Sequence, residues 1–347
     1  MSRRVALAAA WTLAVALYAP AAEAACRYSK FAALKVNTDS GRPHMAGTVN
    51  GYPINVLIDS GAYGTGLTRS AAEGAKLSLS HTDDASFGVG GESQEYQASV
   101  QEFTVGEAKW GRMRMRVIWD MPHDAGTGAI LGANVLFQND VELLLKDNTI
   151  HLFRPQDCKD TYLGYWDKDA IVLKMLDNRS ADDLRAMVTV EVNGKPLRAL
   201  LDTGADVSVI DTKAAEEVGV VRPPEAKEQL FHGIGSRRIA SWVGSFKTVA
   251  IGPQEIRNTK LTVMNLWGAA RQDLGYWGGE SLSHSPQMIL GADFLTSHRV
   301  LFANSQRMVY FTHLGGPVFV AGTPATPNSA APEAQAGRPD PTAPAKP

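Results

Sequence analysis

Two aspartates stand in nearly identical settings in this sequence of 347 residues, and their spacing could support chemistry. One begins the segment Asp59-Ser60-Gly61-Ala62 and the other begins Asp202-Thr203-Gly204-Ala205, so the two carboxylates are 143 residues apart. Two carboxylates held about 3 Å apart share one proton, because like charges that close cannot both ionise. One then serves as a general base and the other as a general acid, a pair that activates water without a covalent intermediate.

The elements that must position these aspartates also occur twice. Asn50-Gly51 and Asn193-Gly194 are flanked by alternating apolar residues, which predicts a β-hairpin with a type I′ turn before each aspartate. After each turn an apolar strand leads into the acidic residue, at 56–58 and at 199–201. The sequence therefore predicts two aspartate loops, each at the end of a buried strand.

Two further landmarks follow each aspartate. Phe87-Gly88-Val89-Gly90-Gly91 is echoed by His232-Gly233-Ile234-Gly235-Ser236, and each predicts the tip of a hairpin. Ile130-Leu131-Gly132 is matched by Ile289-Leu290-Gly291, with 14 extra residues between hairpin and motif in the second copy. These repeats indicate two β-rich modules of about 140 residues each.

With these motifs in register, the chain resembles the retropepsin-like aspartic proteases, with two such units in tandem over residues 30–312. The resemblance implies an all-β fold of two tandem retropepsin-like β-barrel domains, 26–160 and 161–313, related by a pseudo-two-fold axis. It implies that Asp59 and Asp202 are catalytic and that the glycine hairpins are flaps over a protein or peptide substrate. The implied supporting residues of the two loops are Ser60, Gly61, Ala62, Thr203, Gly204 and Ala205, and the implied flap residues are Gly88, Val89, Gly90, Gly91, Gly233, Ile234 and Gly235.

Because a single retropepsin unit supplies one aspartate, we expect the two units to pair within one monomeric chain, with Asp59 facing Asp202. One alternative is homodimerisation through one domain, and another is a non-catalytic peptide-binding protein on the same fold. The first loop departs from the family pattern at Tyr63-Gly64-Thr65-Gly66, where two extra glycines are expected to loosen it. Neither a cofactor nor a metal is expected, since no C-x-x-C or H-E-x-x-H pattern occurs.

Both ends of the chain differ in composition from the repeat. Residues 1–25 combine Arg3-Arg4, an apolar run and Ala22-Glu23-Ala24, which predicts a cleaved signal peptide and a periplasmic or secreted protein. The alternatives are an uncleaved anchor and lipidation of Cys26, although lipidation would need an aliphatic residue where Glu23 stands. Residues 314–347 hold eight of the 18 prolines and predict a disordered tail.

Export also bears on the cysteines, because thiols in an oxidising compartment tend to pair. Cys26 and Cys158 are the only two, so a disulfide between them is predicted, with two unpaired thiols as the alternative. The balance of 34 Lys and Arg against 36 Asp and Glu, a net charge of -2, excludes a polybasic nucleic-acid binder. We expect the substrate to be met in the periplasm or at the membrane surface.

Two smaller features leave alternatives open. Trp267, Tyr276 and Trp277 fall in the inserted segment, where they either anchor a long loop or overhang the cleft and select apolar substrate side chains. The alternating arginines of 112–116 are expected to form the charged face of a solvated or edge strand. A short helix is predicted near 213–218.

Overall fold

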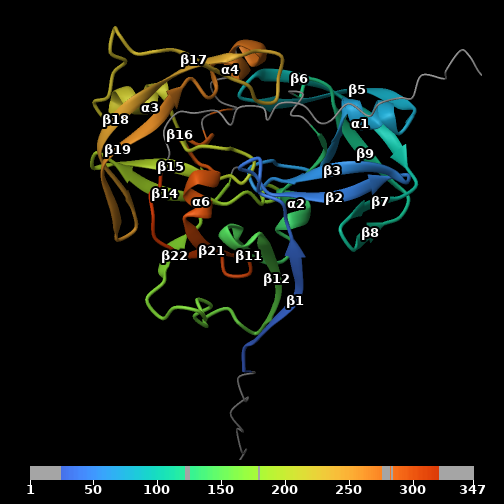
Figure 1. The fold of residues 1–347 in the computed structure, drawn as a ribbon, viewed down its shortest axis with the longest axis horizontal. Helices are drawn as coiled ribbons and strands as arrows, with labels where there is room; N and C mark the ends of the chain where they lie inside the picture. The colour runs from blue at the N-terminus through green and yellow to red at the C-terminus, as the bar shows by residue number, and fades with distance from the viewer. Residues whose placement is uncertain (1–24, 122–125, 179, 276–281, 283, 320–347) are drawn as a thin grey trace, which may run out of the picture.

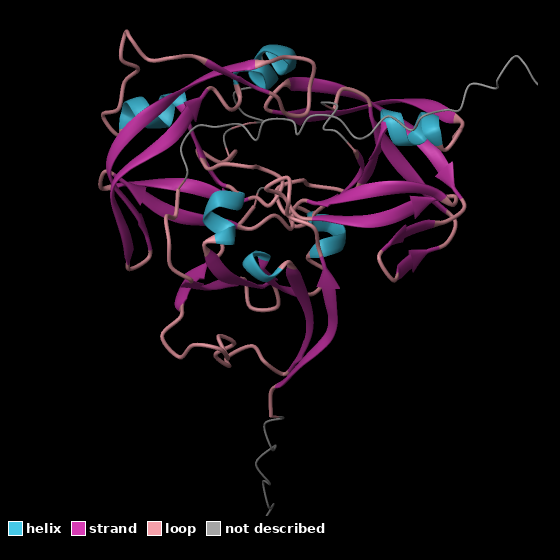
Figure 2. Ribbon diagram, in the orientation of Figure 1, coloured by secondary structure: helices cyan, strands magenta, loops and turns pink. Residues whose placement is uncertain are grey.

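The computed structural model describes residues 25–121, 126–178, 180–275, 282 and 284–319, and strands dominate it (Figure 1). The predicted signal peptide and most of the predicted tail, as well as Tyr276 and Trp277, lie outside the described residues. Figure 2 shows the strands in three groups, one in each half of the molecule and one below, around a central meeting of loops. No helix of the described part is long and apolar enough to cross a bilayer.

The first half is a nine-stranded sheet in the order β5-β6-β9-β4-β10-β3-β2-β7-β8. Its short helix α1 begins after Thr68, whose hydroxyl accepts the Ala71 amide as an N-cap. Its elements are β2 (His44–Val49), β3 (Tyr52–Ile58), β4 (Gly66–Thr68), α1 (Arg69–Gly74), β5 (Leu79–Gly88), β6 (Gly91–Val100), β7 (Phe103–Val105), β8 (Ala108–Trp110), β9 (Met113–Ile118), β10 (Thr127–Leu131) and α2 (Ala133–Leu136).

The second half repeats this plan in a seven-stranded sheet, β14-β15-β20-β16-β19-β18-β17, which an extra β14–β18 pairing closes. The predicted helix near 213–218 is confirmed as α3, capped by Asp211. The elements are β14 (Met187–Val192), β15 (Lys195–Leu201), β16 (Val209–Asp211), α3 (Thr212–Glu217), β17 (Gln229–Phe231), β18 (Ile239–Ile251), β19 (Gln254–Met264), α4 (Gly268–Leu274), β20 (Met288–Leu290) and α6 (Ala292–Thr296).

The two Asn-Gly turns are confirmed. Asn50 and Asn193 both have φ 49°, and Gly51 and Gly194 both have φ 79°, as a type I′ turn requires at its two central positions. The turns join β2 to β3 and β14 to β15 in antiparallel register. The same local chemistry therefore builds the hairpin that leads to each aspartate.

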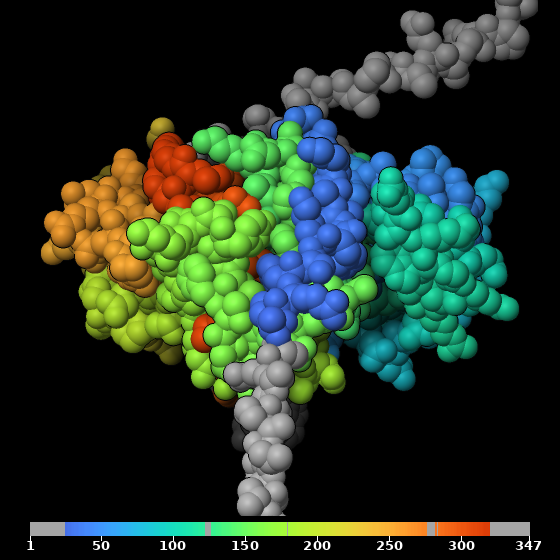
Figure 3. Space-filling view, turned by 90° about the horizontal axis from the view of Figure 1, so that it is seen from below, coloured from blue at the N-terminus to red at the C-terminus, as the bar shows by residue number. Residues whose placement is uncertain are grey.

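A third sheet joins the halves in the order β1-β12-β11-β21-β22-β13. Its central pairing places β11 of the first half beside β21 of the second, with Val141 opposite Phe302. In the view from below, β1 lies in blue between the two halves (Figure 3). Its elements are β1 (Arg27–Lys35), β11 (Asp140–Leu144), the 3₁₀ turn η1 (Leu145–Asp147), β12 (Thr149–Gln156), β13 (Ile171–Lys174), β21 (His298–Ala303) and β22 (Met308–His313).

The predicted disulfide is confirmed between Cys26 and Cys158, whose Cα atoms are 4.5 Å apart. It fixes the residue before β1 to the residues after β12, two segments 132 residues apart in sequence. The chain stays in contact with the core beyond the end expected for the second domain at 313, since Val318 is buried and Phe319 packs on Phe294. Val318 and Phe319, which we assigned to the tail, thus pack against the core, while residues 314–317 are exposed.

The expectation of a solvated face holds for Arg112 and Arg114, which are exposed, but was wrong for Arg116. The strand that carries Arg114 and Arg116, β9, lies between β6 and β4, so it is not at an edge of the sheet. Met115 and Val117 fill the core, while Arg116 is only partly exposed and makes specific contacts described below. Alternation alone does not separate a solvated face from one that pairs with polar groups of the same protein.

Candidate active site

The two aspartates follow directly after equivalent strands, and their loops meet between the halves (Figure 2). β3 runs parallel to β10 with Ile58 opposite Leu131, and β15 runs parallel to β20 with Leu201 opposite Leu290. The Asp59 amide donates to the Leu131 carbonyl at 3.0 Å, and the Asp202 amide donates to the Leu290 carbonyl at 2.9 Å. Each aspartate is therefore fixed by the Ile-Leu-Gly segment beside it.

The glycine of each Ile-Leu-Gly segment lies against the aspartate loop. A Cβ on Gly132 would be 2.6 Å from the Gly64 carbonyl carbon, and one on Gly291 would be 2.6 Å from the same atom of Val207. The next amide, that of Ala133 or Ala292, donates to the carbonyl of Ala62 or Ala205 at 2.8 and 2.7 Å. This close approach explains why the motif ends in glycine in both copies.

The hydroxyls beside the aspartates cross between the two halves. Ser60 Oγ donates to the Leu201 carbonyl at 2.8 Å, and Thr203 Oγ1 donates to the Ile58 carbonyl at 2.6 Å. Each hydroxyl also accepts the backbone amide of the other residue at 2.9 Å. Both side chains are fully buried, so these four bonds lock the two loops together without help from solvent.

The two carboxyl groups face each other across this junction. A Cβ added to Gly61 would lie within 3.0 Å of the Asp202 carboxyl group, and one added to Gly204 within 3.0 Å of the Asp59 carboxyl group. Each aspartate thus packs on the glycine of the opposite loop, and the two side chains share a hydrogen bond. The structure brings together the two residues that the sequence singled out.

The two carboxyl groups differ in the interactions that set their pKa values. Burial raises the pKa of Asp59, and burial followed by repulsion from Asp59 raises the pKa of Asp202 well above its usual range. Asp59 Oδ1 accepts two backbone amides, from Gly61 at 2.9 Å and Ala62 at 2.8 Å, whereas Asp202 Oδ1 accepts one from the described residues, that of Gly204, at 2.8 Å. The extra donor favours the charge on Asp59 and the shared proton on Asp202.

Two arginines flank the pair, and the sequence reasoning missed both. Arg42 and Arg185 each precede an aspartate by 17 residues, and their charges oppose the rise in the pKa of Asp59 and Asp202 respectively. Arg42 crosses between the halves, since its Nε lies 2.8 Å from Asp206 Oδ1. Arg185 instead pairs with Asp183 at 2.7 Å, because the first loop has Tyr63 at the position that matches Asp206.

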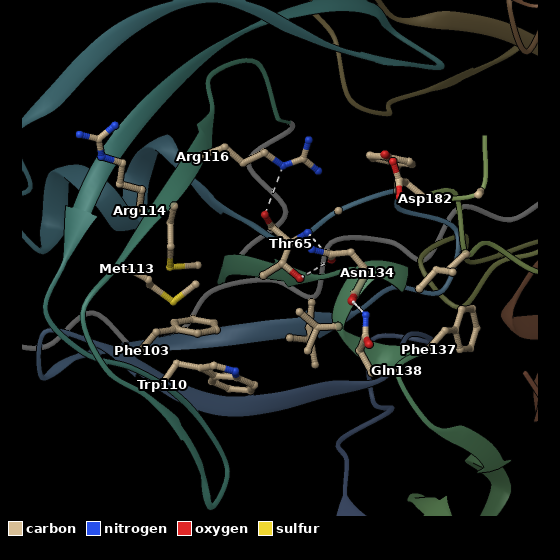
Figure 4. A pocket seen from close by; sticks show the side chains of 17 residues that line it. Thr65, Phe103, Trp110, Met113, Arg114, Arg116, Asn134, Phe137, Gln138 and Asp182 are labelled. Atoms are coloured by element: carbon tan, nitrogen blue, oxygen red, sulfur yellow. Dashed lines mark hydrogen bonds between the residues drawn. The ribbon is translucent and has the colours of Figure 1, made fainter. Parts of the chain in front are cut away.

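The extra glycines of the first loop make room for Arg116. A Cβ on Gly64 would be 2.7 Å from Arg116 Nη2, and one on Gly66 would be 3.1 Å from its Cγ. Arg116 Nε donates to the Thr65 carbonyl at 3.2 Å (Figure 4), and Nη1 lies 3.1 Å from Glu95 on β6. The expectation of a looser loop was therefore wrong, because a side chain from β9 fills the space that the glycines leave.

Asn134 completes the support of this loop. Its Oδ1 accepts the amide and the hydroxyl of Thr65, both at 2.9 Å (Figure 4). In the second half, Val209 stands opposite Thr262 as Gly66 stands opposite Arg116, so the matching position on β19 carries a threonine. The second loop is contacted instead by Arg42 of the other half. Each loop thus carries an aspartate, but different side chains support the two loops.

A cavity of about 790 Å³ opens beside the first loop (Figure 4). Phe103, Trp110, Arg114, Asn134 and Asp182 are among its walls. Neither Asp59 nor Asp202 lines it. The carboxyl pair is thus separate from this hollow, and we assign the cavity no role in its chemistry.

The two glycine hairpins meet each other. The Gly90 amide donates to the Ile234 carbonyl at 2.8 Å, and the Arg237 amide donates to the Gly90 carbonyl at 3.1 Å. Gly91 and Gly235 have φ of 97° and 111°, values that favour glycine. Val89 packs beside the apolar cluster of Val207, Val209, Met264, Leu266 and Ile289, which places the tip of the first hairpin near the second aspartate loop.

The inserted segment contributes to the same region. Trp267 packs on that apolar cluster, and its indole N–H donates to the Pro286 carbonyl at 2.8 Å. The contact with the cluster brings Trp267 near the second aspartate loop, while the bond to Pro286 anchors the segment that contains it. These contacts fit both interpretations of Trp267 made from the sequence. The helix that follows Trp267, α4, contacts both glycine hairpins.

Comparison with protein families agrees with this geometry. The model of the family described as aspartyl protease matches residues 45–135 and 188–294. Each match contains one aspartate loop, one glycine hairpin and one Ile-Leu-Gly segment, which confirms the predicted resemblance and the two tandem retropepsin-like domains of an all-β fold. No curated protein matches the chain.

Proposed function

Because the chain belongs to the aspartyl protease family, we propose that it is an exported endopeptidase in which Asp59 and Asp202 form one water-activating pair. One observation carries the proposal: each carboxyl group packs on the glycine of the opposite loop, so both face the same point between the halves. Ser60, Gly61, Ala62, Thr203, Gly204 and Ala205 support the pair in this proposal.

In the proposed reaction, the ionised carboxylate of the pair takes a proton from a bound water as that water attacks the scissile carbonyl carbon. The protonated carboxyl donates its proton to the carbonyl oxygen, and a tetrahedral intermediate forms. The roles then reverse: the carboxyl that took the proton from water donates it to the departing amine, while the other carboxylate takes a proton back from a hydroxyl of the intermediate. The C–N bond breaks, and each carboxyl regains its starting protonation. The bonding around Asp59 favours it as the base and Asp202 as the acid in the free enzyme, although the two titrate as a pair.

The glycine hairpins, at Gly88, Val89, Gly90 and Gly91 and at Gly233, Ile234 and Gly235, are proposed as flaps over an extended peptide. Their contact with each other supports this role, as does the packing of Val89 beside Val207 and Val209 of the second aspartate loop. Water exclusion beneath such a roof would strengthen the electrostatics of the pair. We propose a protein or peptide substrate and no nucleic acid.

We propose that the catalytic unit is a monomer whose domains, 26–160 and 161–313, pair within one chain. The crossed hydroxyl bonds of Ser60 and Thr203 and the shared sheet of β11 and β21 support this arrangement. The disulfide of Cys26 with Cys158 supports an oxidising compartment, and we propose a periplasmic or secreted location after removal of residues 1–25.

The proposal is tested by incubating the purified protein with an unbiased peptide mixture from about pH 4 to pH 8, a range that spans the titration of a raised carboxyl pair. Asp59→Asn and Asp202→Asn are compared with Asp169→Asn, a control at an exposed aspartate far from the loops in sequence. We expect the protein and the control to cut and both other variants to be inactive. If the unaltered protein binds peptides but cuts none across this range, the peptide-binding alternative replaces the proposal.

A further inference from the structure

The inserted segment of the second half places an acidic side chain beside the turns of both glycine hairpins. Asp273 lies on α4, in a stretch that has no counterpart in the first half. Its Oδ2 accepts the Glu92 backbone amide of β6 at 2.7 Å. The same carboxylate binds Arg237 of the second hairpin through two bonds, at 2.7 Å and 2.6 Å.

We propose that Asp273 is a positioning residue that clamps both hairpins in the closed arrangement over the aspartate pair. The inference rests on the proposed function for its consequence in turnover, while the clamp itself is a property of the fold. One carboxylate joins three elements, namely the first hairpin, the second hairpin and α4, that are otherwise far apart in sequence.

The contact is closely fitted. A Cβ on Gly91 would be 2.5 Å from Asp273 Oδ2, 2.6 Å from Arg237 Nη1 and 3.3 Å from Ala269 Cβ, so α4 rests directly on the turn of the first hairpin. Arg237 Nη1 also donates to the Ala269 carbonyl at 3.3 Å. The Asp273 side chain is 15% exposed, and the hydrogen bonds from Arg237 and Glu92 hold its pKa below the usual value. Bidentate bonding of this kind fixes orientation as well as distance.

The two hairpins are held differently, which gives the clamp a specific consequence. The second hairpin is also attached to the first half by the backbone, since the Gly235 amide donates to the Asp120 carbonyl at 2.8 Å. The first hairpin is held from the opposite half by the Gly90 backbone bonds to the second hairpin and, at the Glu92 amide, by the Asp273 side chain. A substitution at Asp273 should therefore release the first hairpin more than the second.

The expected effect on turnover is a change in substrate binding with little change in chemistry. A charge-assisted pair of bonds at a partly exposed site corresponds to roughly a fivefold to twentyfold shift in the closed-to-open ratio. We expect Asp273→Ala to raise KM by that factor while kcat stays within about twofold, because the carboxyl pair itself is untouched.

The deciding experiment is residue-resolved amide hydrogen exchange on the purified protein, which does not depend on hydrolysis. The variants are Asp273→Ala, Asp273→Asn and Arg237→Gln, with Glu255→Gln as a control that removes an arginine pair elsewhere, at the start of β19. The amides to follow are those of Ser86 and Gly88 on β5, which stand opposite Ser93 and Gly91 of β6 and have no bond to Asp273 in the structure. Arg237→Gln leaves the α4 sequence intact and so separates the clamp from unfolding of that helix.

We expect the Ser86 and Gly88 amides to exchange roughly fivefold to twentyfold faster in Asp273→Ala, less so in Asp273→Asn, and faster in Arg237→Gln, with Glu255→Gln unchanged. If only the Glu92 amide accelerates, or if Arg237→Gln leaves the hairpin amides as in the unaltered protein, Asp273 is not a clamp. If exchange behaves as expected but nothing is hydrolysed, the clamp stands and the proposed function fails.

Discussion

Gly204→Ala is the substitution that most directly probes the packing of each aspartate on the opposite loop. Gly204 does not have a positive φ, so an alanine meets no backbone obstacle there and its effect is steric. The added Cβ would be 2.4 Å from Asp59 Cγ and Oδ2, and ordinary contact begins at 3.4 Å, so the carboxyl group must retreat by about 1.0 Å. A misplacement of about 1 Å at reacting groups costs on the order of a hundredfold in rate.

We therefore expect kcat to fall about a hundredfold in Gly204→Ala, with a loss of folding stability of only about 1–3 kcal/mol from overpacking. The assay is the initial rate of cleavage of one peptide selected from the mixture, together with urea unfolding of the same preparation. Gly61→Ala should behave alike, because its Cβ would meet the Asp202 carboxyl group.

Gly111→Ala is the matched control, since nothing lies within 4 Å of a Cβ at that position. It should leave both rate and stability unchanged. A folded Gly204→Ala protein that keeps more than a third of the unaltered kcat would refute the facing arrangement of the two carboxyls.

Three other outcomes follow from the same contacts. Thr203→Val leaves the Ile58 carbonyl and the Ser60 amide buried without their partner, and should reduce the urea-derived stability by about 2–5 kcal/mol, whereas a loss below about 1 kcal/mol would contradict the crossed bonding. Arg185→Gln removes a charge that lowers the pKa of Asp202, so both limbs of the pH–rate profile should move to higher pH, and a shift to lower pH would show the sign to be wrong. Replacing both cysteines by serine opens a link across 132 residues and should cost about 4–5 kcal/mol in the loop-closure picture, a value that an unchanged unfolding midpoint would exclude.

Local signals in the sequence were enough to predict the parts of the site that each half builds for itself. Asn50-Gly51 and Asn193-Gly194 require positive φ at both positions, and the turns that satisfy this lead into the aspartates. The apolar strands and the Ile-Leu-Gly segments, both visible as repeats in the sequence, pair in parallel in each half. The conformation of these elements depends on residues within one module, so the sequence pattern of that module predicts them.

Contacts between distant segments were harder to anticipate. The pairing of β11 with β21 depends on both halves, and no local periodicity encodes it. Arg42 and Arg185 recur at the 143-residue offset of the aspartates, so extending the repeat toward the N-terminus would have shown them as candidates. Arg116 had no such signal, since its counterpart in the second half is Thr262.

The claim that one chain builds one shared pair is tested most directly by mixing two inactive variants. Asp59→Asn and Asp202→Asn are purified separately, assayed alone and assayed together, with the molecular mass of each followed by light scattering. We predict that the unaltered protein cuts as a monomer and that neither variant, alone or mixed, cuts at all. Activity that returns on mixing would place the pair between two chains, and activity retained by either variant alone would show that one half works without the other.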